Sequence, residues 1–289
     1  MCLRKLSSIA ILIVSLGALA FSAVKLVPYI REETQSASTY SDLAAFFSGE
    51  DVVLDDVVDE DGADGRNWGL LDTPVYGDAN VSLAEETGET EEDEADDSAD
   101  VDGSAYSDPE AATRLQALHE KNNDCVAWLK IEGTVINYPV MYRPQSKDYY
   151  LHRDYYGKKS SAGALYISEI CNPDTSDNVI IYGHHMNSGK MFAALNKYKK
   201  QSFYQEHQQI VLETLHGTEV YEVIFALTTP VYTGRDFKYY AFANARNARE
   251  FEEYIDNCMA RALYDTGKTA QYGDRLLTLS TCEYSQRNG

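Results

Sequence analysis

Residues 276–282 read LLTLSTC, and this stretch near the end of the 289-residue chain decides which fold the sequence encodes. Its apolar and β-branched residues are typical of a strand buried in a sheet. The strand pattern stops at Cys282, where the sequence turns polar. A lone cysteine is most often a small buried core residue, but a cysteine at the rim of a sheet can also present a nucleophilic thiol. Taken alone, the stretch leaves both interpretations open.

A second predicted strand ends in a chemically useful residue about a hundred positions earlier. Residues 178–183, NVIIYG, form an apolar run that breaks at Gly183 and is followed by His184 and His185. Histidine is the usual base for a cysteine nucleophile. Adjacent histidines on an extended segment point to opposite faces. Because the chain also lacks H-E-x-x-H and C-x-x-C motifs, we expect no metal site and no cofactor. The two strand ends favour thiol chemistry, although their spacing does not show that they meet.

The C-terminal part of the chain alternates short strands with a few helices. Periodicity predicts helices over residues 108–124, 190–198 and 244–265, and strands over 125–141 (two, with a turn at Glu132–Gly133), 162–170, 178–186, 208–232 (two, with a turn at His216–Gly217) and 274–282. Many short strands with few helices predict a mostly β domain of the α+β type, a barrel or a sandwich with peripheral helices.

The negative charge of the chain is concentrated in one segment. The formal net charge is −21, and residues 42–110 contain 24 acidic side chains against one basic side chain, Arg66. The remainder is close to neutral and has no basic stripe, so we predict no nucleic-acid partner. A segment with so much like charge and so few apolar residues cannot bury enough surface to offset the entropy of ordering. We therefore predict an acidic disordered linker over residues 32–110, ahead of a folded catalytic domain over residues 111–289.

The first 31 residues predict a short cytoplasmic stub and a membrane anchor. Arg4 and Lys5 precede an apolar run over residues 6–27, which has roughly the 20 residues that a helix needs to span a bilayer. Basic residues ahead of the run favour a cytoplasmic N-terminus, and hence a single-pass protein of the cell membrane with an extracellular catalytic domain. A cleaved signal peptide is the alternative, because Ala18–Ala20 resembles a cleavage site. The five scattered cysteines do not form a disulfide framework.

Several separate stretches of the domain resemble the sortase family, and within it class B. They read WLKIEGTVINYPVM (128–141), DYYLHRDYYGKKSSAGALYI (148–167), NVIIYGHHMNSGKMFAALNKY (178–198) and LLTLSTC (276–282). The similarity covers nearly all of residues 123–285 and none of the acidic linker. It implies an eight-stranded β-barrel with peripheral helices, and a membrane-anchored cysteine transpeptidase on the surface of Gram-positive bacteria.

The resemblance also implies the catalytic residues and the partners. Cys282 matches the family's nucleophile, and His184 matches its general acid and base. Cys282 would attack the carbonyl that follows a threonine in the C-terminal sorting signal of a secreted protein, and a thioester would form. An amine from a peptidoglycan precursor or a pilin lysine would then attack that thioester. His185 falls at a variable position, where we expect a residue that faces solvent or the edge of a cleft.

The family's arginine is where the sequence departs from the pattern. In the family it follows the cysteine by roughly eight to ten residues and opens one more apolar strand, whereas this chain ends seven residues after Cys282. We expect the chain to stop just before that arginine and to lack the last strand of the barrel. Arg287 is a weaker candidate for the same role. Two other functions remain open at this point, a thiol peptidase that uses water as acceptor and an inactive barrel that binds peptides.

Overall fold

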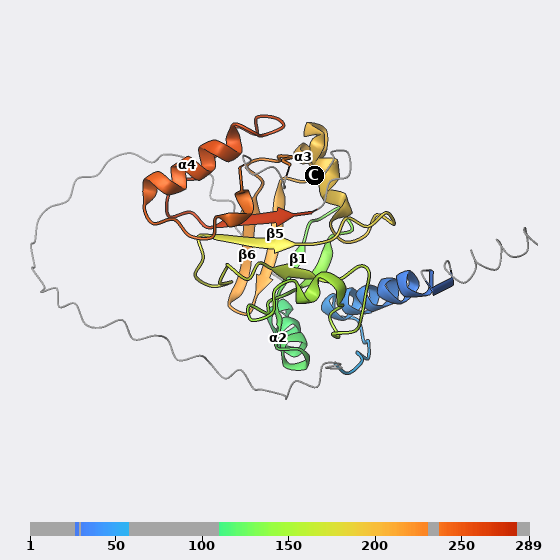
Figure 1. Ribbon diagram of the computed structural model, residues 1–289. Coiled ribbons are helices and arrows are strands. Elements are labelled where there is room, and N and C mark those ends of the chain that lie inside the picture. The colour runs from blue at the N-terminus through green and yellow to red at the C-terminus, as the bar shows by residue number, and fades with distance from the viewer. Residues whose placement is uncertain (1–26, 29, 58–109, 231–236, 282–289) are drawn as a thin grey trace, which may run out of the picture.

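The computed structural model describes residues 27–28, 30–57, 110–230 and 237–281 (Figure 1). The strands are β1 (Cys125–Lys130), β2 (Asn137–Met141), β3 (Leu165–Ile167), β4 (Asn178–Tyr182), β5 (Gln209–Thr214), β6 (Gly217–Glu222) and β7 (Leu276–Ser280). The helices are an N-terminal helix (residues 30–47), α2 (Ala111–Lys121), α3 (Gln201–Glu206) and α4 (Ala248–Met259), with the short 3₁₀ helices η2 (Tyr149–His152), η3 (Phe192–Lys199) and η4 (Tyr239–Ala241).

All seven of these strands join one sheet in the order β6-β5-β1-β2-β3-β4-β7. The β2–β3 and β4–β7 pairs are parallel and the other pairs are antiparallel. The sheet curls into a nearly closed barrel, with α4 toward one end and α2 toward the other in Figure 1. The prediction of a mostly β barrel with peripheral helices is therefore confirmed. The described residues contain seven of the eight strands that the resemblance implies.

Several predicted elements are longer than the observed ones, and the difference is largest for the second strand of the 208–232 pair and for the 244–265 helix. The second strand of the 208–232 pair ends at Glu222, because Glu222 pairs with Gln209 at the very start of β5 and finds no further partner on that strand. The helix predicted over residues 244–265 begins at Ala248, where the Asn247 side chain caps it by accepting a hydrogen bond from the backbone N–H of Glu250. It ends at Met259.

The prediction of disorder is wrong for the first part of the 32–110 segment. Residues 30–47 form a helix, and its Leu43 is fully buried against the barrel. Phe47 stacks on Trp128 of β1 with ring centroids 4.2 Å apart, and Leu54 is also buried. This stretch has enough apolar side chains at helical spacing to fold onto the domain, in spite of its acidic neighbours. Residues 58–109 lie outside the described residues.

The predicted membrane anchor also lies almost entirely outside the described residues. Within the described part of the chain, no helix is both long enough and apolar enough to cross a bilayer. Cys282 and Arg287 likewise fall outside the described residues.

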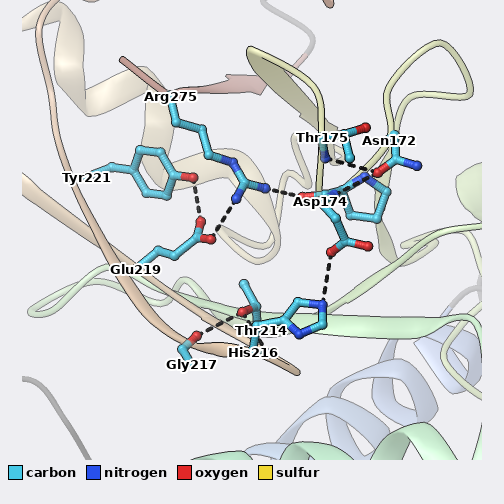
Figure 2. A network of polar contacts seen from close by, with 10 residues as sticks. Asn172, Asp174, Thr175, Thr214, His216, Gly217, Glu219, Tyr221 and Arg275 are labelled. Atoms are coloured by element: carbon cyan, nitrogen blue, oxygen red, sulfur yellow. Dashed lines mark hydrogen bonds and ion pairs between the residues drawn. The ribbon is translucent and has the colours of Figure 1, made fainter. Parts of the chain in front are cut away.

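One polar network joins the two edge strands of the sheet. Arg275, just before β7, donates a hydrogen bond to Glu219 of β6 over 2.9 Å, and it also reaches the backbone oxygen of Pro173 (Figure 2). The Tyr221 hydroxyl donates to the other oxygen of Glu219 over 2.5 Å. Beside this group, His216 contacts Asp174 at 3.3 Å. The network connects β6, the residue before β7 and the β3–β4 connection, where the two edge strands β6 and β7 face each other.

Loss of this polar network should destabilise the barrel measurably. The side chains of Arg275 and Glu219 are only 33% and 29% exposed, so we expect Arg275→Ala to lower the free energy of unfolding by about 1–3 kcal/mol in a urea titration. Arg249→Ala is the matched control, because Arg249 and its partner Glu253 are 86% and 60% exposed. That exposed pair should contribute only about 0.3–0.5 kcal/mol. Equal losses of unfolding free energy in the two variants would contradict the stabilising role of the network.

Candidate active site

Parallel pairing of β4 with β7 brings together the two strand ends that the sequence singles out. Tyr182 lies opposite Ser280 in this register. The backbone N–H of Gly183 donates to the oxygen of Ser280 over 3.1 Å, and the Thr281 hydroxyl donates to the oxygen of Gly183 over 2.8 Å. Thr281, the residue before Cys282, is therefore hydrogen-bonded to Gly183, the residue before His184.

Gly183 is needed where β4 ends because its surroundings leave no room for a side chain. A Cβ at this position would lie 2.7 Å from Cδ2 of Phe192, and it would also collide with the side chain of Leu165. The backbone can therefore pass between these two core residues only as glycine. The close fit fixes where the chain leaves the sheet and turns into His184.

His184 is half-buried and held by a backbone carbonyl. Its Nε2 atom lies 2.7 Å from the oxygen of Leu151, in η2. A carbonyl can only accept a hydrogen bond, so Nε2 carries the proton in the neutral ring and Nδ1 is left as the proton acceptor. The backbone oxygen of His184 accepts a hydrogen bond from Phe192 over 2.9 Å. Hydrogen bonds therefore hold both the side chain and the backbone of His184.

The surroundings of His184 favour the neutral imidazole. Burial lowers its pKa below the ordinary value, the hydrogen bond to the Leu151 oxygen raises it, and the neighbouring His152 lowers it. The His152 ring stacks on the His184 ring, with centroids 5.6 Å apart and planes inclined by 23°. A histidine that is neutral near pH 7 can accept a proton from a thiol.

His185 contacts a different part of the structure, residues 191 and 196. Its Nδ1 atom lies 2.5 Å from the Asn196 side chain, and its backbone bridges to Met191. The residue is half-buried, which is compatible with the expected position facing solvent or the edge of a cleft.

Three other cysteines can be compared with the candidate nucleophile. Cys125, Cys171 and Cys258 are all buried and unpaired with one another. Burial raises the pKa of each thiol, to about 12 for Cys258. A thiol with a raised pKa carries little of the reactive thiolate at neutral pH.

A cavity of about 500 Å³ lies between the two edge strands, β6 and β7. Its lining includes Tyr221 and Val223 on one side, Leu277 and Leu279 on the other, and Thr281 at the exit of β7. The cavity therefore reaches the residue that precedes Cys282.

The barrel thus brings the strand that leads to Cys282 alongside the strand that leads to the half-buried His184. The sortase domain family matches residues 129–288. Sortase B of Listeria monocytogenes is 36% identical over 176 residues, which cover 60% of this chain and 69% of that protein. Sortase B of Staphylococcus aureus is 31% identical over 173 residues, which cover 59% of this chain and 68% of that protein.

The solved structures agree with these matches. The Staphylococcus aureus sortase B–substrate complex superposes with a TM-score of 0.55 at 27% identity, over 62% of this chain and 80% of that one. The chain therefore belongs to the sortase family, and its relatives place it in class B. It is a cysteine transpeptidase that cleaves sorting signals and transfers the cleaved protein. A hydrolase or an inactive peptide-binding barrel is not favoured.

Sequence reasoning missed two partners of His184. The first is the carbonyl of Leu151, which any residue type could provide, so no sequence signal identifies it. The second is His152, which lies inside the stretch DYYLHRDYYG but has no strand end or glycine beside it to mark it. Both come from η2, which sequence periodicity did not predict.

Removal of the neighbouring imidazole should change the titration of His184. We expect the pKa of His184 to rise in His152→Gln, because two protonated rings that stack repel each other and this repulsion is then lost. Titration of the His184 ring signals by NMR measures the change. His185→Gln is the control, since His185 contacts Asn196 instead. An unchanged or lowered pKa in His152→Gln would show that the two rings do not interact electrostatically.

Proposed function

We propose that Cys282 is the nucleophile and His184 the general acid and base of the transpeptidation reaction. One observation carries this assignment, the hydrogen bond of 2.8 Å between the Thr281 hydroxyl and the oxygen of Gly183. The parallel register of β4 and β7 supports it, because that register runs from Asn178 and Leu276 to Tyr182 and Ser280 without a break. Continued by two residues, the same register would set position 282 against position 184.

Each step of the reaction then has a defined proton path. The thiol of Cys282 gives its proton to Nδ1 of His184, and the sulfur attacks the carbonyl carbon of the threonine that precedes the scissile bond of the sorting signal. The carbon–nitrogen bond breaks as His184 returns the proton to the leaving amine, and a thioester remains. The acceptor amine then attacks the thioester and loses a proton to His184. The sulfur leaves and recovers that proton. Backbone N–H groups near Cys282 would stabilise the oxyanion in both steps.

The proposal also includes where the enzyme acts. The apolar run over residues 6–27 would anchor the protein in the cell membrane and hold the catalytic domain outside it. The acceptor would be an amine of a peptidoglycan precursor or of a pilin subunit, because both are accessible on that side. The substrates would be secreted proteins with a C-terminal sorting signal. Because residues 30–57 already dock on the barrel, residues 58–109 would not set the distance between the domain and the bilayer.

Removal of Cys282 should abolish the reaction and removal of His184 should slow it strongly, each with little effect on folding. We expect Cys282→Ala to eliminate cleavage of a labelled sorting-signal peptide, and His184→Gln to slow it by about 10²–10⁴-fold. Product analysis by mass spectrometry, with and without an added amine, separates transfer from hydrolysis.

Cys258→Ala and His216→Gln are the controls for these two variants. The first removes a buried thiol and the second an exposed imidazole in the β5–β6 turn. Both should keep wild-type turnover. Cleavage that persists in Cys282→Ala would rule out the thiol mechanism, and products identical with and without the amine would rule out transfer.

Alkylation should identify the reactive thiol independently of any substrate. We expect iodoacetamide at neutral pH to modify Cys282 well before Cys125, Cys171 or Cys258, because burial raises the pKa of those three thiols. Peptide mapping by mass spectrometry follows each site over time. His184→Gln should slow modification of Cys282 alone. Equal rates at all four cysteines in folded protein would contradict the assignment.

A further inference from the structure

The N-terminal helix lies outside residues 129–288, the range that the sortase domain family matches, yet it contacts the segment that supports the candidate histidine. We infer that this helix positions His184 through three side chains, Glu32, Ser36 and Tyr40. The inference rests on the proposed role of His184. Three hydrogen-bonded steps connect the helix to the imidazole.

The first step joins the helix to residues 160–163. Glu32, Ser36 and Tyr40 are spaced by four residues and therefore lie on one face of the helix. Glu32 accepts a hydrogen bond from the backbone N–H of Ser161 over 2.6 Å. The hydroxyl of Ser36 lies 2.9 Å from that of Ser160, and both serines are buried.

Tyr40 completes the first step. Its hydroxyl donates to the backbone oxygen of Gly163. Burial raises the pKa of this hydroxyl well above the usual value, so it stays protonated as a donor. Three hydrogen bonds from one helical face thus hold Ser160, Ser161 and Gly163.

The second step joins residues 160–164 to η2. The backbone N–H of Ser160 donates to the oxygen of His152, and that of Ala164 donates to the oxygen of Tyr150, each over 3.0 Å. Gly163 packs so closely that an added Cβ would lie 2.5 Å from the oxygen of Leu151. The carbonyls on either side of Leu151 are therefore hydrogen-bonded, and Leu151 itself is in van der Waals contact with the same segment.

The third step joins η2 to the histidine. The Leu151 oxygen accepts the Nε2 proton of His184 over 2.7 Å, which keeps Nδ1 free to accept a proton from the nucleophile. A carbonyl can fix a ring only as firmly as its own peptide is held. If residues 160–163 lose their ties to the helix, the Leu151 carbonyl gains freedom and the population of the Nε2-protonated ring falls. The helix is thus a positioning element for the reaction.

The test is a triple variant that removes the polar ties but keeps the apolar packing of the helix. In the full chain, Glu32→Ala, Ser36→Ala and Tyr40→Phe together leave Leu43 and Phe47 on the barrel. We expect kcat for cleavage of a labelled peptide with threonine before the scissile bond to fall about 10-fold, with KM within about twofold of wild type. The ¹⁵N shifts of the His184 ring should move from a single Nε2-protonated form toward a mixture of tautomers.

The matched control is a second triple variant on the exposed side of the same helix. Thr34→Ala, Gln35→Ala and Ser38→Ala remove the same number of polar side chains from exposed positions. This control should keep the wild-type kcat and ring spectrum. Wild-type kcat and wild-type ¹⁵N shifts in the Glu32, Ser36 and Tyr40 variant would overturn the inference, because the helix would then contribute packing alone.

Two further measurements keep the result decisive. If the triple variant does not fold, the single variants Ser36→Ala and Ser38→Ala can be compared instead. We expect kcat to fall about threefold in Ser36→Ala and to stay at the wild-type value in Ser38→Ala. The ring spectrum requires no turnover. Failure of the proposed function, with wild type and Cys282→Ala equally inactive, therefore leaves the tautomer measurement able to confirm or refute the positioning role by itself.

Discussion

The parallel pairing of β4 with β7 is the constraint on which the site depends. The two strands are separated by nearly a hundred residues, and five consecutive pairs fix their register. A shift of one residue would turn the side chains of one strand to the opposite face. The register therefore determines both which residues fill the barrel and which residues emerge together at its rim. Gly183 and Thr281 are the last partners that this pairing holds in place.

The histidine illustrates how burial and hydrogen bonding act against each other. Burial favours a neutral ring, while the Leu151 carbonyl favours a proton on Nε2 in either protonation state. Burial has the larger effect, so the ring near pH 7 is neutral and has a defined tautomer. A base needs both properties, because a charged ring cannot accept a proton and a ring with mixed tautomers offers the wrong nitrogen part of the time.

Much of the fold could be predicted from sequence because strand patterns are local. Residues 178–183 and 276–282 show their strand character within a few positions, and the family resemblance implied that Cys282 and His184 act together, which periodicity could not show. The supports of His184 were not predictable in this way. Leu151, Ser161 and Gly163 act through their backbones, and Ser160 adds a hydroxyl contact, so side-chain identity carries little information about most of these contacts.

The error over residues 32–57 has a different cause. Average composition over a long acidic segment concealed a short stretch in which Ser36, Tyr40, Leu43 and Phe47 recur at helical spacing. Most of the stability of a helix in a protein comes from tertiary packing, and here those contacts are with Trp128 and with residues 160–163. The same contacts that order the helix also restrain the peptide that holds His184. Folding of this N-terminal segment and precision at the catalytic histidine are therefore consequences of one interface.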